Sequence, residues 1–190
     1  HSIKAVYSGD SNFKSDSTTI TQVVNTVAPS VTLKSSLNPS TFEQNVTFTA
    51  FVTNSSHTPT GTVSFYDGTT ILGVVPLSGD SAHESVAWLV RGSHLIKAVY
   101  SGDSNFNTDS TTIIQVVNQA SPTVTLKSGL NPSVFEQSVT FTAIVTNSIQ
   151  TPTGSVAFYD GTTLLATVSL TGDSAQTSTA TLAAGSHSIK

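Results

Sequence analysis

The chain has 190 residues, of which only 9% are charged, and its seven basic and eleven acidic residues give a formal net charge of −4. Basic residues that are so few and so scattered cannot form a phosphate-tracking surface, so no nucleic-acid partner is expected. The absence of cysteine excludes disulfides, thiolate metal sites and cysteine nucleophiles. No apolar run approaches the ~18 residues of a membrane span, so no membrane insertion is expected.

An internal repeat with a period of 93 residues dominates the sequence. Residues 1–13 return at 94–106 with one change, and the first four residues return again at 187–190. Residues 28–97 and 121–190 are identical at 48 of 70 positions, and residues 1–27 match 94–120 at 21 of 27, without insertion or deletion. A period of this length indicates one small domain per repeat.

Hydrophobic and polar residues alternate with a period of two through most of the repeat, which predicts β-strands. The clearest strand spans 44–53, where Val46, Phe48, Ala50 and Val52 share one face. Pro39 and the Asp67-Gly68 pair mark turns. In chain order, the predicted strands A to G span residues 31–34, 44–53, 63–66, 70–77, 82–90, 95–100 and 110–117.

Seven short strands without a helical segment predict an all-β fold, a tandem of seven-stranded immunoglobulin-like antiparallel β-sandwiches. Residues 28–120 then form one complete repeat. Residues 1–27 are strands F and G of a preceding repeat, and residues 121–190 are strands A to E and the start of strand F of a following one. The chain begins in mid-repeat without an initiator methionine, so both ends are expected to be cuts within a longer polypeptide.

Several motifs follow one another in a characteristic order: Asn-Pro-Ser, Val-Thr-Phe-Thr-Ala, Pro-Thr-Gly-Thr-Val-Ser-Phe-Tyr-Asp-Gly and Ile-Lys-Ala-Val-Tyr-Ser-Gly-Asp-Ser-Asn-Phe. Together they resemble the bacterial immunoglobulin-like domain (group 3) family. The resemblance implies beads of a large secreted or cell-surface protein, and therefore an extracellular or cell-surface location. It supplies no catalytic motif, and the chain has no nucleophile elbow or phosphate loop, so no enzymatic activity is expected.

A hydrophobic contact patch is predicted on the outer face of the sheet that holds strands B and E. The alternation along strand E places Ala87 and Leu89 in the core and points the intervening residues outward. Exposed aromatic clusters mark contact surfaces, although a bulge that shifts the register would instead bury Trp88 in the core. The predicted patch consists of Phe51, Val86, Trp88 and Val90.

Acidic residues in the predicted loops form the one candidate metal site. If the loops of consecutive repeats meet, their carboxylates could bind Ca²⁺ and stiffen the junction. The alternative, which the lack of an Asp-x-Asp-x-Asp spacing favours, is that these residues stabilise turns and that no cofactor is bound. His1, His94 and His187 stand one domain apart and are expected in turns or strands rather than at a shared metal. The candidate calcium ligands are Asp80, Asp103, Asp109, Asp67 and Glu43.

The partial repeats at the two ends complement each other. Residues 121–190 lack most of strand F and all of strand G, while residues 1–27 are an F–G hairpin without a sandwich. If these are the ends of the whole molecule, the hairpin of one chain could complete the sandwich of another and build a head-to-tail filament. The side chains expected to fill the partner's core are Ile3, Ala5, Tyr7, Phe13, Ile20 and Val24.

The sequence therefore predicts a structural segment, a rod, stalk or filament, whose partners are other copies of itself or neighbouring repeats. The short linkers, stiffened by Pro29 and Pro122, favour a semi-rigid rod. Two alternatives stay open. One is an adhesin module that recognises a host protein or glycan through the apolar patch or a loop end, and the other is a spacer attached to a secreted enzyme.

Overall fold

The computed structural model describes residues 1–190 and consists of fifteen β-strands without a helix. Consequently there is no helix that could cross a membrane. The chain divides into two compact units, His1–Asn118 and Gln119–Lys190. The all-β class expected from the period-two pattern is confirmed.

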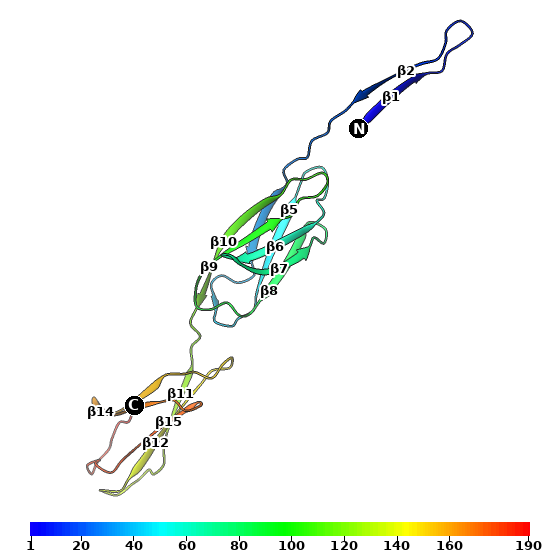
Figure 1. Ribbon diagram of the computed structural model, residues 1–190. Coiled ribbons are helices and arrows are strands. Elements are labelled where there is room, and N and C mark those ends of the chain that lie inside the picture. The colour runs from blue at the N-terminus through cyan, green and yellow to red at the C-terminus, as the bar shows by residue number, and fades with distance from the viewer. The chain divides into compact units, whose positions relative to one another are not determined.

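An isolated two-stranded hairpin begins the chain (Figure 1). Strands β1 (Ser2–Tyr7) and β2 (Asp16–Thr21) are antiparallel and pair only with each other. The register places Ile3 opposite Ile20. Every residue of both strands is exposed, so the hairpin has no hydrophobic core of its own.

A complete two-layer sandwich follows the hairpin (Figure 1). One layer is a three-stranded sheet in the order β3-β5-β8, and the other is a five-stranded sheet in the order β4-β10-β9-β6-β7. The first sheet consists of β3 (Ser30–Ser35), β5 (Val46–Thr53) and β8 (Ser81–Val86). The second consists of β4 (Ser40–Thr41), β6 (Thr62–Asp67), β7 (Thr70–Pro76), β9 (Gly92–Tyr100) and β10 (Asp109–Asn118).

The core of this sandwich is built from the alternating faces of the two sheets. All four inward residues of β5 are completely buried, as the sequence pattern predicts, and Phe65, Ile96 and Tyr100 of the other sheet are buried as well. The outward residues of β5 are mostly threonines, such as Thr47, whose hydroxyl lies 2.8 Å from that of Ser85. Each sheet therefore has one apolar face that must be covered and one hydroxyl-rich face that remains in water.

The two layers are also joined by the first strand of the repeat, which changes sheets. After β3 the chain crosses over, and β4 pairs in parallel with the end of β10. The Asn38 side chain bridges the crossover, because its amide nitrogen donates to the Ile114 carbonyl at 2.6 Å and its oxygen accepts from the Val116 N–H at 3.0 Å. The sequence predicts a turn here but not the two-residue strand β4.

A fully buried glutamine, Gln115, ties this crossover to the core. Its side-chain oxygen accepts a 2.6 Å hydrogen bond from the Ser35 hydroxyl, and its nitrogen donates to the Leu37 carbonyl at 2.9 Å and to the Ser40 hydroxyl at 3.2 Å. A buried amide is tolerated only when its polar atoms have partners. Gln115 therefore fixes the place at which the chain leaves one sheet for the other.

The structure assigns the fourth strand to a sheet and corrects the end of the fifth. The fourth strand, β7, pairs with β6 in the five-stranded sheet. The fifth strand, β8, ends at Val86, four residues earlier than expected. Its register against β5 places Val46 opposite Val86, so Val86 points into the core.

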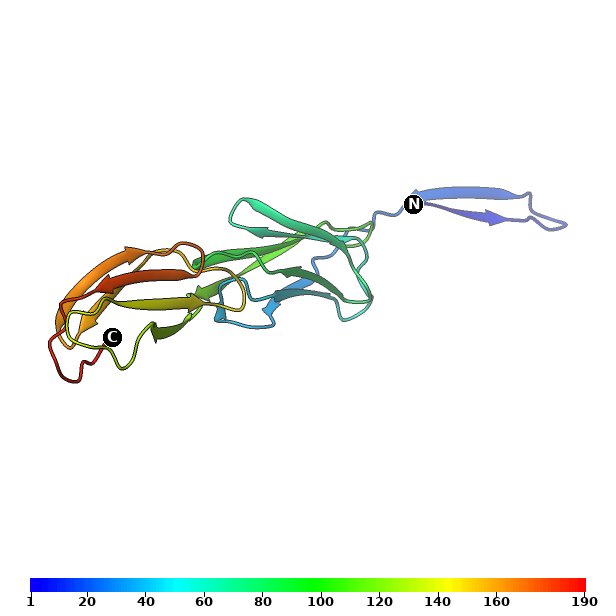
Figure 2. The same cartoon turned by 90° about the horizontal axis from the view of Figure 1, so that it is seen from below.

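The C-terminal unit has counterparts of β3, β5, β6, β7 and β8 but an incomplete second sheet (Figure 2). One sheet contains β11 (Thr123–Ser128), β12 (Val139–Thr146) and β15 (Ser174–Thr179), and the other contains only β13 (Ser155–Asp160) and β14 (Thr163–Ser169). Counterparts of β4, β9 and β10 are absent from its sheets. The core is correspondingly smaller, with five buried residues: Val139, Phe141, Ala143, Phe158 and Ala175.

Replacement of Gln115 by alanine tests the role of the buried amide. Gln115→Ala should lower the free energy of unfolding of the 28–118 sandwich by about 2–4 kcal/mol, because several buried polar groups lose their partner and a cavity forms. The measurement is denaturant unfolding followed by Trp88 fluorescence at a protein concentration that keeps the chain monomeric. Gln22→Ala is the matched control, since Gln22 occupies the same position in the exposed hairpin and should leave this transition unchanged.

Candidate functional site

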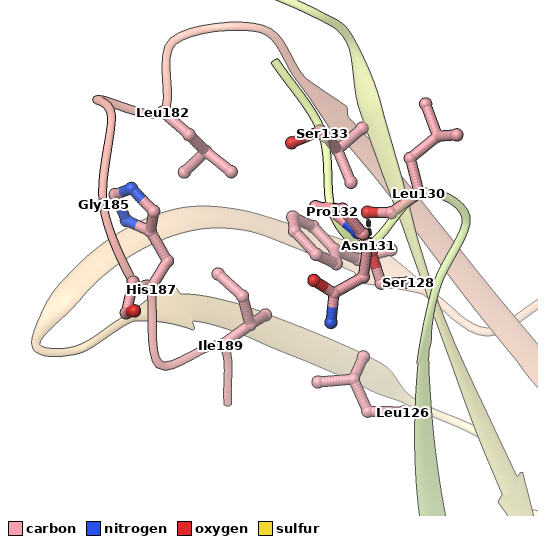
Figure 3. A pocket seen from close by; sticks show the side chains of 13 residues that line it. Leu126, Ser128, Leu130, Asn131, Pro132, Ser133, Leu182, Gly185, His187 and Ile189 are labelled. Carbon is pink, nitrogen blue, oxygen red and sulfur yellow. Dashed lines mark hydrogen bonds between the residues drawn. The ribbon is translucent and has the colours of Figure 1, made fainter. Parts of the chain in front are cut away.

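A cavity lies on the open side of the C-terminal unit (Figure 3). It has a volume of about 670 Å³ and lies between β11, the loop that follows β11 and the last residues of the chain. Figure 3 shows Leu126 and Leu130 on one side of the cavity and Leu182 and Ile189 on the other. The cavity wall therefore combines apolar side chains with polar groups, among them Ser128, Asn131, Ser133 and His187.

Comparison with the complete sandwich shows what this cavity lacks. Leu33 in β3 is 8% exposed, whereas its counterpart Leu126 in β11 is 38% exposed. Val31 packs against the core of its sandwich, whereas the counterpart Val124 is exposed. The difference arises because β9 and β10 cover this end of the first sandwich and no strand takes their place in the second. The cavity is thus an uncovered core and not a preformed pocket for a small molecule.

The same difference appears in the N-terminal hairpin. Tyr7 is 48% exposed and Phe13 is 67% exposed, whereas the identical residues Tyr100 and Phe106 of the complete sandwich are 0% and 5% exposed. Ile3 and Ile20 lie opposite each other on the same face. All six residues predicted for completion of a partner are exposed: Ile3, Ala5, Tyr7, Phe13, Ile20 and Val24.

The polar partners of this tyrosine differ between the two copies. In the complete sandwich Tyr100 donates its hydroxyl to the Thr60 carbonyl at 2.5 Å, and Asp103 accepts from the Thr60 N–H and hydroxyl, both at 2.8 Å. Burial raises the pKa of Tyr100 to about 12, and the negative charge of Asp103 contributes further. In the hairpin Tyr7 instead donates to the Asp10 carboxylate at 3.0 Å. The Asp10 carboxylate therefore accepts from the tyrosine of its own hairpin, whereas its counterpart Asp103 accepts from Thr60.

A histidine at the head of strand F forms a separate polar cluster. The Nδ1 atom of His94 lies 2.7 Å from the Asp67 carboxylate, and Nε2 lies 2.7 Å from the Val90 carbonyl oxygen. Burial lowers the pKa of His94, but the hydrogen bonds to Val90 and Asp67 outweigh it and leave the pKa raised. Both nitrogens face acceptors, so the protonated imidazolium is the form that fits. The C-terminal unit repeats the cluster at 2.8 and 2.7 Å with His187, Ala183 and Asp160.

Among the predicted acidic residues, Glu43, Asp80 and Asp103 lie in turns or loops, whereas Asp67 ends β6 and Asp109 begins β10. Hydrogen bonds from the Thr60 and Asn105 backbone N–H groups hold the pKa of Asp103 well below its usual range. The carboxylate of Asp109 accepts from the next backbone N–H at 2.8 Å, and the backbone carbonyl of Asp80 accepts from Val52. Asp67 binds His94, and Glu43 adopts a positive φ of 59°. No three acidic or histidine side chains come close enough to hold a metal ion.

The predicted contact patch does not form as one surface. Val86, expected outside, is 3% exposed, while Ala87, expected in the core, is exposed. Trp88 is 56% exposed, and Val90 is exposed too. Phe51 pairs with Ser81, five positions from the Val46–Val86 pair, and is therefore about 17 Å from the end of β8 where Trp88 follows. Lys34 covers the Phe51 ring, with its nitrogen 5.4 Å from the ring centre.

Two residues that shape the crossover of the complete sandwich were not predicted from the sequence. Gln115 and Asn38 both resemble solvent-facing loop or strand residues by type. The alternation does contain a signal for Gln115, because it lies between Ile113 and Val117 on the inward face of β10. For Asn38 no local signal distinguishes a crossover from an ordinary turn.

A family model described as bacterial Ig-like domain (group 3) matches residues 33–118 and 124–190. The chain belongs to this family. Bacterial Ig-like domains often occur in surface proteins, and such domains are generally non-enzymatic. The match covers both the complete Ig-like repeat and the incomplete one.

Solved structures with a similar trace include fibronectin(III)-like modules of Clostridium thermocellum CbhA, with 18% identity over 84% of this chain and 83% of that chain and a TM-score of 0.39. The human OSCAR ligand-binding domain has 12% identity over 85% of this chain and 93% of its own, with a TM-score of 0.35. No curated protein sequence matches the chain.

The histidine cluster makes a prediction about pH. Because the pKa of His94 is raised above its ordinary 6.5, the stabilisation by this cluster is complete below that pH and is lost as the pH rises through the folded-state pKa. Asp67→Asn should lower the pKa of His94, measured by NMR titration of the imidazole C–H signals. His187 in the same spectrum is the control and should not shift. A pKa of His94 that is insensitive to Asp67→Asn would refute this assignment.

Strand E offers a second prediction, based on neighbouring residues of opposite burial. Val86→Ala should lower the free energy of unfolding by about 1–3 kcal/mol, because it removes buried methyl groups from the core. Trp88→Ser should change it by less than about 0.5 kcal/mol, because most of the ring lies in water. Thermal unfolding monitored by circular dichroism measures both. A larger loss for Trp88→Ser than for Val86→Ala would mean that the register of β8 is wrong.

Proposed function

We propose that the chain is a structural segment of a bacterial secreted or cell-surface protein, in which each Ig-like repeat adds length to a rod or stalk. The proposal includes no catalysis and no bound cofactor. Two observations support it: the family membership, and the places at which the chain enters and leaves the complete repeat.

The chain enters and leaves the complete repeat at opposite ends. Val27 forms a parallel bridge to Phe106, in the F–G loop just beyond the end of β9, whereas Val117 pairs with Gly92 at the start of β9. These two places are separated by the nine residues of β9, or about 26 Å. A repeat that is entered at one end and left at the other advances the polypeptide by its own length. This is the observation on which the proposal rests.

The sequence relation between repeats supports the same role. The two copies compared over residues 28–97 and 121–190 keep 48 of 70 residues, and the retained ones include the core face of β5 and β12. The outer faces are rich in serine and threonine, which remain hydrated without charge. Interchangeable beads with few surface charges suit a spacer better than a specific binding site.

One observation favours the alternative, an adhesin module. Trp88 and Val90 are exposed in the complete repeat, and the corresponding residues of the next repeat are Thr181 and Ala183. An exposed aromatic ring that occurs in only one copy is typical of a residue that contacts a protein or glycan ligand. The candidate contact surface therefore consists of Trp88 and Val90, and not of the four-residue patch predicted from the sequence.

Deletion of residues 28–120 from the parent protein in its source cells separates the two functions. For a spacer, immunogold labelling with antibodies against this chain should still mark the cell surface or the secreted material, and each projection should shorten by about 30–40 Å. Labelling confined to the cytoplasm would contradict the proposal. For an adhesin, the deletion and the double variant Trp88→Ser/Val90→Ser should both abolish adherence to the ligand, whereas for a spacer the double variant should have no effect.

A further inference from the structure

We propose that the complete repeat bears tension, and that the contacts between residues 35–42 and strand β10 are the clamp that carries it. This inference goes beyond the spacer role above, because a spacer needs only length, whereas resistance to tension needs a particular arrangement of hydrogen bonds. All residues of the clamp lie inside the complete repeat.

The clamp joins the segment that enters the repeat directly to the strand that leaves it. The entering chain forms β3, crosses over and forms β4, while β10 is the last strand of the repeat. Ser40 and Thr41 of β4 lie opposite Val117 and Asn118 of β10. The Phe42 N–H donates a further hydrogen bond of 2.9 Å to the Asn118 carbonyl. Tension applied at the two ends of the repeat can therefore pass across this one contact without entering the strands between.

Side chains on both sides reinforce the β4–β10 pairing. Asn38 bridges two backbone groups of β10, since it donates to the Ile114 carbonyl at 2.6 Å and accepts from the Val116 N–H at 3.0 Å. The side chain of Gln115 reaches in the opposite direction and binds three groups of the entering segment. Gln115 is completely buried, so water does not compete for these hydrogen bonds. The side chains thus link the same two segments as the backbone pairing.

The direction of the strands determines how the clamp is loaded. The chain enters the repeat at the end where Val27 bridges Phe106 and leaves at the end where Val117 pairs with Gly92. Because β4 and β10 are parallel, pulling these ends apart draws β4 toward the entry end and β10 toward the exit end. The two strands are then displaced along their own axes, while their hydrogen bonds run across them. All bonds of the clamp are stretched together, and bonds that must break together resist a higher force than bonds that open in turn.

The same strand β10 can also be loaded in a geometry that opens its bonds in turn. Arg91 precedes β9 and Gln119 follows β10. Both lie at the exit end, because Val117 pairs with Gly92 there. Pulling Arg91 and Gln119 apart separates β10 from β9 beginning at one end of their ladder. One molecule therefore offers both geometries, with the same hydrogen bonds and the same core.

A second route for the tension leads through the core and not through the clamp. β3 is paired with β5, and the inward residues of β5 pack in the core together with Val86 of β8. The two routes differ in the residue that limits the resistance: Asn38 if the clamp carries the load, and Val86 if the core does.

The sequence of the repeats favours the clamp. Repeats connected in series carry the same force, so every bead of an array under tension needs the same resistance. The polar residues of the clamp are identical wherever another copy contains them, whereas the buried Val86 is replaced by Thr179 in the following repeat. The identical residues are Ser35 and Ser128, Leu37 and Leu130, Asn38 and Asn131, Ser40 and Ser133, and Gln115 and Gln22.

Single-molecule force spectroscopy of the 190-residue chain tests the proposal. The chain contains no cysteine, so two introduced cysteines fix the points at which force is applied. Asn25→Cys with Gln119→Cys loads the repeat from entry to exit, and Arg91→Cys with Gln119→Cys loads it at the exit end alone; all three positions are exposed. Residues 1–24 and 120–190 carry no load in either pair. At equal loading rates the first pair should unfold at a force about twofold or more above that of the second, because forced unfolding is governed by the unfolding barrier along the direction of pulling.

Asn38→Ala in the first cysteine pair tests the clamp itself. The variant should lower the unfolding force, because two hydrogen bonds to β10 are lost. Val86→Ala is the matched control, since it removes buried methyl groups from the core but no contact of the clamp, and it should leave this force unchanged.

Either of two results would overturn the inference: equal unfolding forces for the two cysteine pairs, or a loss of force with Val86→Ala as large as with Asn38→Ala. Neither result would contradict the spacer role, which is tested separately by deletion of the repeat in the source cells.

Discussion

Every sheet in this chain has one apolar face, and that face requires a second sheet to cover it. In the complete repeat the requirement is met, since the inward residues of β5 pack against those of β6 and β9 and are completely buried. In the C-terminal unit β12 keeps its buried residues, but Leu126 and Val124 of β11 emerge into water because the covering strands are missing. The hairpin β1–β2 corresponds to the strands that cover the core of the complete repeat, but no second sheet packs against it and all of its strand residues are exposed. The differences in exposure between matching residues of the complete repeat, the C-terminal unit and the hairpin follow from this one constraint.

The fold was largely predictable because the period-two pattern is unambiguous where one face is buried and the other carries hydroxyls. It identified all seven main strands of the complete repeat and the absence of helices. The error at strand E arose from Leu89, which is buried but lies after the strand has ended. If Leu89 is taken as part of the alternating strand, counting back in steps of two places Val86 on the outward face, although Val86 is buried. The sheet to which β7 belongs could not be predicted, because pairing partners depend on the tertiary structure and leave no trace in a local pattern.

The functional residues were predictable to a different degree. The apolar set of the hairpin followed from the repeat alone, because each member has an identical counterpart one period later. The hydrogen-bond network of Gln115 did not, because a glutamine in an alternating strand is indistinguishable by type from a solvent-facing residue. Polar groups at the crossover matter as much as the apolar ones, since they determine which hairpin fits and not only whether an apolar one is attracted. The histidine cluster was expected to be a turn or strand feature, and its place beside Asp67 and Val90 agrees with that expectation.

The identity of the buried residues of β1–β2 and β9–β10 has a consequence for biosynthesis. The outer faces differ, with Ser2 and Thr21 in place of Leu95 and Ile114, but no inward-facing residue tells one hairpin from the other. A newly made repeat therefore cannot recognise its own last two strands by their chemistry, and only their proximity along the chain favours the correct partner. Emergence of the strands from the ribosome in order supplies that proximity. Chemically denatured chains refolding all at once lose it, and exchanged hairpins between neighbouring molecules would be their characteristic kinetic trap.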